Sequence, residues 1–131
     1  HEQVVILHTP GHSPGSISVL FRPTSNEKNV GVLFTGDTYS YRLVTDVMTG
    51  FPRYGNDRPL QAKIIQSLVN EWGTEWDFIA PGHGHVRDYR AIKQQQQQQT
   101  DDVHALQQAE VQPAVEELME YASMLAGKRN R

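Results

Sequence analysis

The sequence predicts an α/β fold in which three strands precede a helix, a fourth strand and a helical tail. Short runs of apolar and β-branched residues, bounded by glycine, proline and polar residues, are typical of strands. Apolar residues at spacings of four between 60 and 72 are typical of a helix with one buried face. The predicted strands are Val4–His8, Ser16–Phe21, Val30–Thr35 and Trp76–Ala80.

The first three strands are separated by turn-forming segments. The loop at 9–15 holds two prolines and two glycines, so it interrupts regular structure. In the next strand Ile17, Val19 and Phe21 alternate onto one face, and a polar turn at 24–29 follows. The third strand is almost entirely apolar, which predicts that both of its faces are buried.

The segment at 39–55 shows no clear period, and we predict a long loop with one short helix. Asn56 or Asp57 would cap the helix that follows, with Pro59 in its first turn. Gly73 would end this helix. Its predicted apolar stripe consists of Leu60, Ile64, Leu68 and Trp72.

The chain is predicted to divide into one domain at 1–90 and a glutamine-rich linker with a helical tail at 91–131. The tract Gln94–Gln99 is typical of a solvated linker or a helix extension. Thr100 would cap a helix running through Val111, and Pro113 would begin a second helix that ends at Gly127. We expect this tail to dock on the domain or on a partner.

Composition narrows the function classes. Fifteen acidic residues against 12 basic ones give a net charge of -3, which argues against a nucleic-acid-binding surface. No apolar run approaches the ~20 residues that span a bilayer, so we expect no membrane partner. The sequence contains no cysteine, so metal binding would rest on histidine, aspartate and glutamate. The expected partner is a small-molecule substrate.

Three polar residues, His12, Asp37 and His83, lie in glycine-bearing loops that each follow an apolar strand. Glycines beside a polar residue let the backbone turn sharply and direct one side chain. Neutral imidazole and carboxylate are the usual nitrogen and oxygen ligands of zinc, manganese or iron. Taken without family knowledge, these residues predict either a metal site or three ordinary hydrogen-bonded turns.

Three stretches resemble successive motifs of the metallo-β-lactamase superfamily, in that family's order. They are HTPGHSPGS at 8–16, LFTGDT at 33–38 and IAPGHGH at 79–85. They resemble the third, fourth and fifth motifs, and the likeness extends over Val4–Arg90. Among the members, the glyoxalase II-like hydrolases are the branch that this chain resembles.

The resemblance implies an αββα sandwich, of which this chain would be the C-terminal half, followed by its helical tail. It implies that His12 and His83 each belong to one of two metal sites and that Asp37 is the catalytic carboxylate bridging the metals. The cofactors would be two divalent ions, zinc first, with iron or manganese as alternatives. A metal-activated hydroxide would attack an ester, thioester or similar bond.

Three neighbouring residues are candidates for supporting roles. Thr38 would hydrogen-bond near Asp37. Tyr39 would either line a substrate pocket or pack in the core. His85 would either contact the substrate or be a plain loop histidine.

The family's second motif, His-x-His-x-Asp-His, has no counterpart in these 131 residues. We therefore expect the true N-terminus to lie upstream, the full-length parent to be active and this chain alone to be inactive. Without the other sheet of the sandwich, one apolar sheet face would be exposed, so we expect the chain to be marginally stable or to self-associate. The C-terminal helical tail is a second surface through which it could associate. The alternatives are a non-catalytic scaffold and a single-iron persulfide oxidase. Localisation stays open between cytoplasm and plastid.

Overall fold

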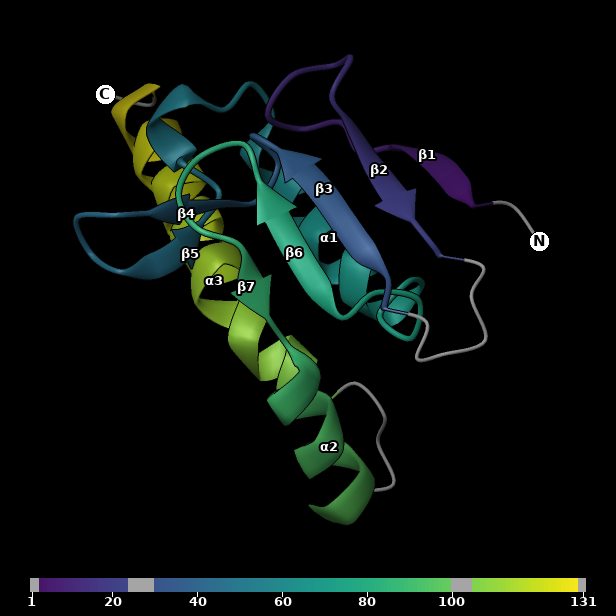
Figure 1. The fold of residues 1–131 in the computed structure, drawn as a ribbon. Helices are drawn as coiled ribbons and strands as arrows, with labels where there is room; N and C mark the ends of the chain where they lie inside the picture. The colour runs from purple at the N-terminus through teal and green to yellow at the C-terminus, as the bar shows by residue number, and fades with distance from the viewer. Residues whose placement is uncertain (1–2, 24–29, 100–104, 130–131) are drawn as a thin grey trace.

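The structure is a computed structural model that describes residues 3–23, 30–99 and 105–129 (Figure 1). Its main sheet has the strand order β1-β2-β3-β6-β7, and a second sheet pairs β4 with β5. The strands are β1 Val4–His8, β2 Ile17–Phe21, β3 Val32–Gly36, β4 Ser40–Arg42, β5 Val47–Thr49, β6 Phe78–Pro81 and β7 Arg87–Asp88. The helices are η1 Pro52–Tyr54, α1 Arg58–Asn70, α2 Arg90–Gln99 and α3 Ala105–Arg129.

Strand direction brings three loops to one edge of the main sheet. The β1–β2 and β2–β3 pairs are antiparallel, and β3 pairs with β6 in parallel, with α1 in the connection. Strands β1, β3 and β6 therefore run in the same direction. The loops that follow them, at 9–16, 37–39 and 82–86, lie at their common carboxyl-terminal edge.

One face of the main sheet packs against helices, and the other face is exposed to solvent. One face carries Leu7, Leu20, Leu33 and Ile79, all buried in a single core with residues of α1 and α3. On the other face, Ile6 lies opposite Val19, which lies opposite Phe34. We call this second face the open face, because Ile6, Ile17, Phe21 and Phe34 are all exposed there.

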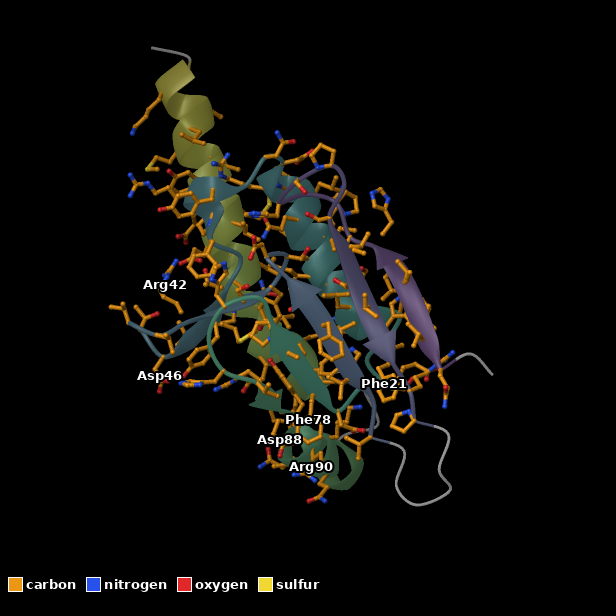
Figure 2. The ribbon with its side chains drawn as sticks, turned by 45° about the horizontal axis from the view of Figure 1, so that its top comes forward. Phe21, Arg42, Asp46, Phe78, Asp88 and Arg90 are labelled. Atoms are coloured by element: carbon orange, nitrogen blue, oxygen red, sulfur yellow. The ribbon has the colours of Figure 1, made fainter. Side chains whose placement is uncertain are left out.

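The open face confirms the prediction that one apolar sheet surface would be exposed. It also shows that the expected burial of both faces of the third strand is wrong, since Phe34 is 47% exposed. Figure 2 shows Phe21 and, towards β7, Phe78 on this face. There the guanidinium carbon of Arg90 lies 4.9 Å from the centre of the Phe78 ring, and Arg90 also pairs with Asp88.

Helix α1 begins as predicted, with the side chain of Asp57 accepting a hydrogen bond from the Leu60 backbone N–H at 3.1 Å. Its buried face is different from the predicted stripe. Apolar residues spaced by four drift by about 40° per step around a 3.6-residue helix, so a strict run of this kind slants across the surface. Only Leu68 of the stripe is buried with the true inner face, which is formed by Gln61, Ala62, Ile65, Leu68 and Val69.

The C-terminal part is more helical than predicted. The glutamine tract belongs to α2, and α3 runs without a break through Pro113 and Gly127. A proline removes one backbone hydrogen bond, but tertiary packing supplies most of the stability of a helix in a protein. Val111 and Ala114, on either side of Pro113, are buried in the same core as the sheet. The predicted cap at Thr100 and the turn at 24–29 lie outside the described residues.

The predicted loop at 39–55 contains the hairpin β4–β5 and the short helix η1. Strands of three residues are too short to show a sequence period, which explains why the hairpin was not predicted. Within the described ranges, no helix has both the length and the apolar character needed to cross a bilayer.

Candidate metal centre

Glycines allow the loop of His12 and the loop of His83 to come close to their neighbours. Gly11 has a φ of 137°, and a Cβ there would lie 2.5 Å from the Gln61 Cα. This contact sets the His12 loop against the first turn of α1, where the Asp57 N–H donates to the Gly11 carbonyl at 2.7 Å. At Gly82 a Cβ would lie 2.9 Å from the Gly36 carbonyl oxygen, so a larger residue would push apart the loops of Asp37 and His83.

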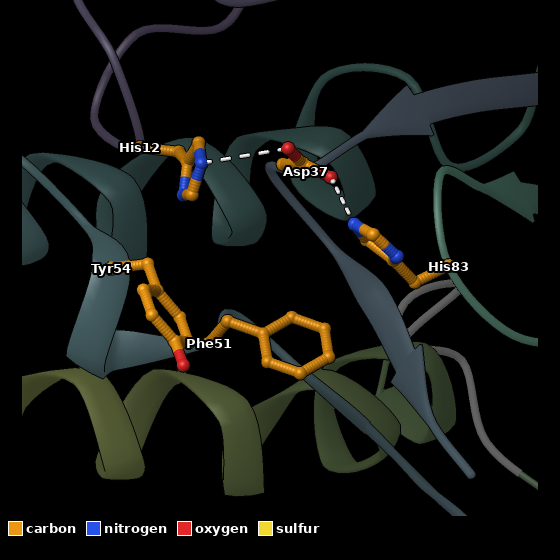
Figure 3. Close-up of a pocket in the computed structure, with 5 residues that line it drawn as sticks. All are labelled: His12, Asp37, Phe51, Tyr54 and His83. Carbon is orange, nitrogen blue, oxygen red and sulfur yellow. Dashed lines mark ion pairs between the residues drawn. The ribbon is translucent and has the colours of Figure 1, made fainter.

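The structure brings His12, Asp37 and His83 together at the sheet edge (Figure 3). The His83 Nε2 lies 3.0 Å from the Asp37 Oδ1. The His12 Nε2 lies 3.6 Å from the other carboxylate oxygen, Oδ2. The two imidazoles therefore approach opposite oxygens of one carboxylate.

The donor types fit a divalent cation, and the arrangement is that of a shared carboxylate. In the described part of the chain, no group of three or more His, Asp or Glu side chains is placed to hold a metal ion. His12 and His83 approach different oxygens of Asp37, so this carboxylate is the group that the two imidazoles share. The buried Nδ1 of His12 also has no hydrogen-bond partner among the described residues, although buried polar atoms are normally paired.

Thr38 is buried directly below the site. Its hydroxyl donates to the Thr9 carbonyl at 3.3 Å, and its own carbonyl accepts from the Gln61 amide at 2.9 Å. Thr38 thus joins the loop of Asp37 to the loop of His12 and to α1. This placement is compatible with the predicted supporting role.

Tyr39 is not among the residues that line the pocket, and its side chain packs in the core, the second of its two predicted placements. The side chain is fully buried, and burial raises the pKa of its hydroxyl well above the ordinary value, with Tyr89 adding to the shift. His85 is exposed and lies outside the pocket lining that the structure describes. Its ring is tilted against Tyr41, with 5.5 Å between the ring centres.

A pocket of about 220 Å³ opens beside the three polar residues. Its remaining lining is aromatic and consists of Phe51 and Tyr54. The Phe51 ring meets the His83 ring edge-on, with 5.8 Å between their centres. Sequence reasoning did not select these two residues, because the segment that holds them has no period that distinguishes a pocket wall from packing.

Comparison with known proteins identifies the fold. No protein-family model and no curated protein matches the sequence. The structure is similar to an archaeal metallo-β-lactamase superfamily protein from Sulfolobus tokodaii, with 15% identity and a TM-score of 0.46, over 89% of this chain and 46% of that chain. It is also similar to a subclass B3 metallo-β-lactamase from a soil metagenome library, with 19% identity and a TM-score of 0.53, over 95% of this chain and 47% of that chain.

The second likeness, combined with the strand order and the packing of helices on one sheet face, shows that this chain has about half of a metallo-β-lactamase fold. The chain spans about half the length of the solved structures it matches. The fold class predicted from the three motifs is confirmed to that extent. The roles of the individual site residues stay predictions.

Proposed function

We propose that this chain carries part of the binuclear metal centre of a metallo-β-lactamase-type hydrolase. In this proposal His12 would help to hold one divalent cation, His83 would help to hold a second, and the Asp37 carboxylate would be shared between them. The observation that carries it is the contact of each imidazole with a different oxygen of the same carboxylate. If Asp37 only formed an ion pair with one histidine, the second imidazole would have no reason to approach its other oxygen.

The chemistry follows from the donor set. Divalent cations bound here would lower the pKa of a coordinated water to about 7 and stabilise developing negative charge. The carboxylate of Asp37 would offset the repulsion between the two cations, and Thr38 would hold its loop in place. Zinc is the first choice because neutral imidazole and carboxylate suit it, with iron and manganese as alternatives. The substrate would be a small molecule with an ester, thioester or similar bond.

The remaining ligands would come from residues outside these 131. Catalytic zinc sites usually have three protein ligands per metal, and this site offers one histidine and one shared carboxylate to each. We expect the chain alone to bind zinc weakly and to show no hydrolysis. The test of completeness is the adjoining coding sequence, where a His-x-His-x-Asp-His motif should lie within about 100 residues upstream, a domain-scale distance.

Metal contact is tested directly by nuclear magnetic resonance of the histidine side chains. Substoichiometric Mn²⁺ should broaden the ring signals of His12 and His83, because paramagnetic broadening detects weak binding. His85 is the internal comparison: it lies outside the pocket, so its ring should broaden less than those of His12 and His83, because paramagnetic broadening falls steeply with distance. Asp37→Asn should abolish the selective broadening. Equal broadening of all three histidines, or none, would contradict the metal site.

A further inference from the structure

We infer that Phe51 and Tyr54 form a specificity wall and that the pocket selects substrates with a flat apolar group beside the bond to be cleaved. This inference rests on the proposed function for its meaning, because it concerns the same pocket. The two rings lie across the pocket from His12, Asp37 and His83, as Figure 3 shows. One side of the pocket is thus polar and the opposite side is aromatic.

The pocket has the size of a ring-bearing group. Its volume is about 220 Å³, and an apolar cavity of about 150 Å³ already binds benzene. A flat group lying against Phe51 would place its attached carbonyl towards the polar side. Tyr54 is largely exposed, so the pocket is open there and a longer substituent can extend into solvent.

The strained backbone conformation of Phe51 indicates that its ring is held in a specific position. Its φ of 47° and ψ of 64° lie in the left-handed region, which a bulky residue rarely adopts. Such strain persists only where surrounding contacts impose it, and it is concentrated at functional sites. An ordinary packing phenylalanine would have no need of it, and Phe51 is only half-buried.

A network of polar contacts holds Phe51 in this conformation. Its backbone N–H donates to the Thr49 hydroxyl at 3.0 Å, and that hydroxyl in turn donates to the carboxylate of Glu117 on α3. Arg42 donates to Glu117 at 3.3 Å and lies over the Phe51 ring, 5.4 Å from its centre. The ring is therefore fixed between the Arg42 guanidinium and the edge of His83. Glu117 is a positioning residue that connects α3 to the pocket wall.

The test uses neutral probes, so that the charge of Asp37 and the presence of metal do not affect the comparison. Benzamide and acetamide share an amide and differ in the flat ring. Benzamide should shift the ring signals of Phe51, Tyr54 and His83 in nuclear magnetic resonance spectra, and acetamide at the same concentration should not. Equal shifts with both probes would overturn the inference.

Three variants complete the test. Phe51→Leu, which keeps an apolar side chain and loses the flat ring, should weaken benzamide binding by roughly 3- to 10-fold, the range expected for one aromatic contact. Tyr54→Leu should also weaken it, and because Tyr54 has an exposed side chain this variant should fold even if Phe51→Leu does not. Phe21→Leu is the matched control on the open face and should change nothing.

Unchanged benzamide binding in both pocket variants would overturn the specificity wall. The Mn²⁺ experiment on His12 and His83 reports on the metal site separately. Loss of metal contact with retained benzamide selectivity would remove the proposed function and leave the apolar pocket. Metal contact without benzamide selectivity would support the proposed function and overturn the specificity wall.

Discussion

The two faces of the main sheet have nearly the same apolar character and opposite environments. Leu33 on the covered face is fully buried, while its neighbour Phe34 on the open face is 47% exposed. A monomeric soluble protein rarely exposes a continuous apolar patch of this kind, and such patches usually mark interaction sites. The covered face therefore contributes the buried core of this chain, whereas the apolar side chains of the open face remain exposed to solvent.

The largest expected effect is a difference in stability between alanine variants of Leu33 and Phe34. Leu33→Ala should lower the free energy of unfolding by about 2–5 kcal/mol, because it creates a cavity in a packed core. Phe34→Ala should lower it by about 1 kcal/mol or less, because half of its ring is already in water. Urea denaturation of both variants measures the difference. Similar losses would show that the open face is buried in solution.

The second prediction tests whether α3 unfolds together with the core on the covered face of the sheet. Leu118→Ala should lower the free energy of unfolding by roughly 2–4 kcal/mol, since Leu118 is fully buried in the common core. Met119, the next residue, is largely exposed, and Met119→Ala is the matched control. A single cooperative transition in both variants is expected. An α3 that melts separately at lower denaturant would support the predicted division at residue 90.

The third prediction concerns association through the open face. We expect the chain to self-associate at high concentration, and Ile17→Lys combined with Phe34→Lys should weaken that association at least tenfold, about 1.4 kcal/mol. Val44→Lys, at an exposed position on the β4–β5 hairpin, controls for added charge away from the sheet. Sedimentation velocity measures the distribution of species. Association that persists in the double variant would point to another surface, such as the tail.

The smallest effect is a pH dependence that arises on the covered side. Burial raises the pKa of the Tyr39 hydroxyl and of the Tyr89 hydroxyl above their ordinary value of 10.0. Above that pH the unfolded chain loses these protons while the folded chain keeps them, so stability should fall as pH rises, by at most about 1.4 kcal/mol per pH unit for each proton. Burial lowers the pKa of Lys93, which acts in the opposite direction just below its ordinary value of 10.5.

Tyr39→Phe isolates the tyrosine contribution to this pH dependence. The variant should show a shallower loss of stability between about pH 10 and 11, where an ordinary tyrosine ionises. Denaturation midpoints at several pH values in that range provide the measurement. An unchanged slope would mean that the Tyr39 hydroxyl is not buried in solution.

Local sequence patterns predicted the parts of this protein that depend on neighbours along the chain. The strands β1, β2, β3 and β6 were predicted to within about two residues, and so was the start of α1 at its Asp57 cap. These features follow from alternation, from turn residues and from capping, all of which operate over a few residues. His12, Asp37 and His83 were selected from the sequence because each follows a strand and lies in a glycine-bearing motif, and their roles as ligands stay predictions.

The predictions that failed depended on contacts between distant segments. The inner face of α1 is set by where the sheet lies, and the continuity of α3 through Pro113 is set by packing on both sides of the proline. The burial of Tyr39 beside Tyr89 joins residues 50 positions apart in the chain. The pocket wall at Phe51 depends on Glu117, which lies on the last helix.

The fold class, the strands β1, β2, β3 and β6, and the choice of His12, Asp37 and His83 as candidate ligands thus came from the sequence alone. The packing of the whole chain was needed to show that the two imidazoles face opposite oxygens of Asp37 and that aromatic rings form the other side of the pocket. The physical reason is that residue type fixes what a side chain can donate or accept. Its distance and direction to a partner depend on how strands and helices from the whole chain pack together.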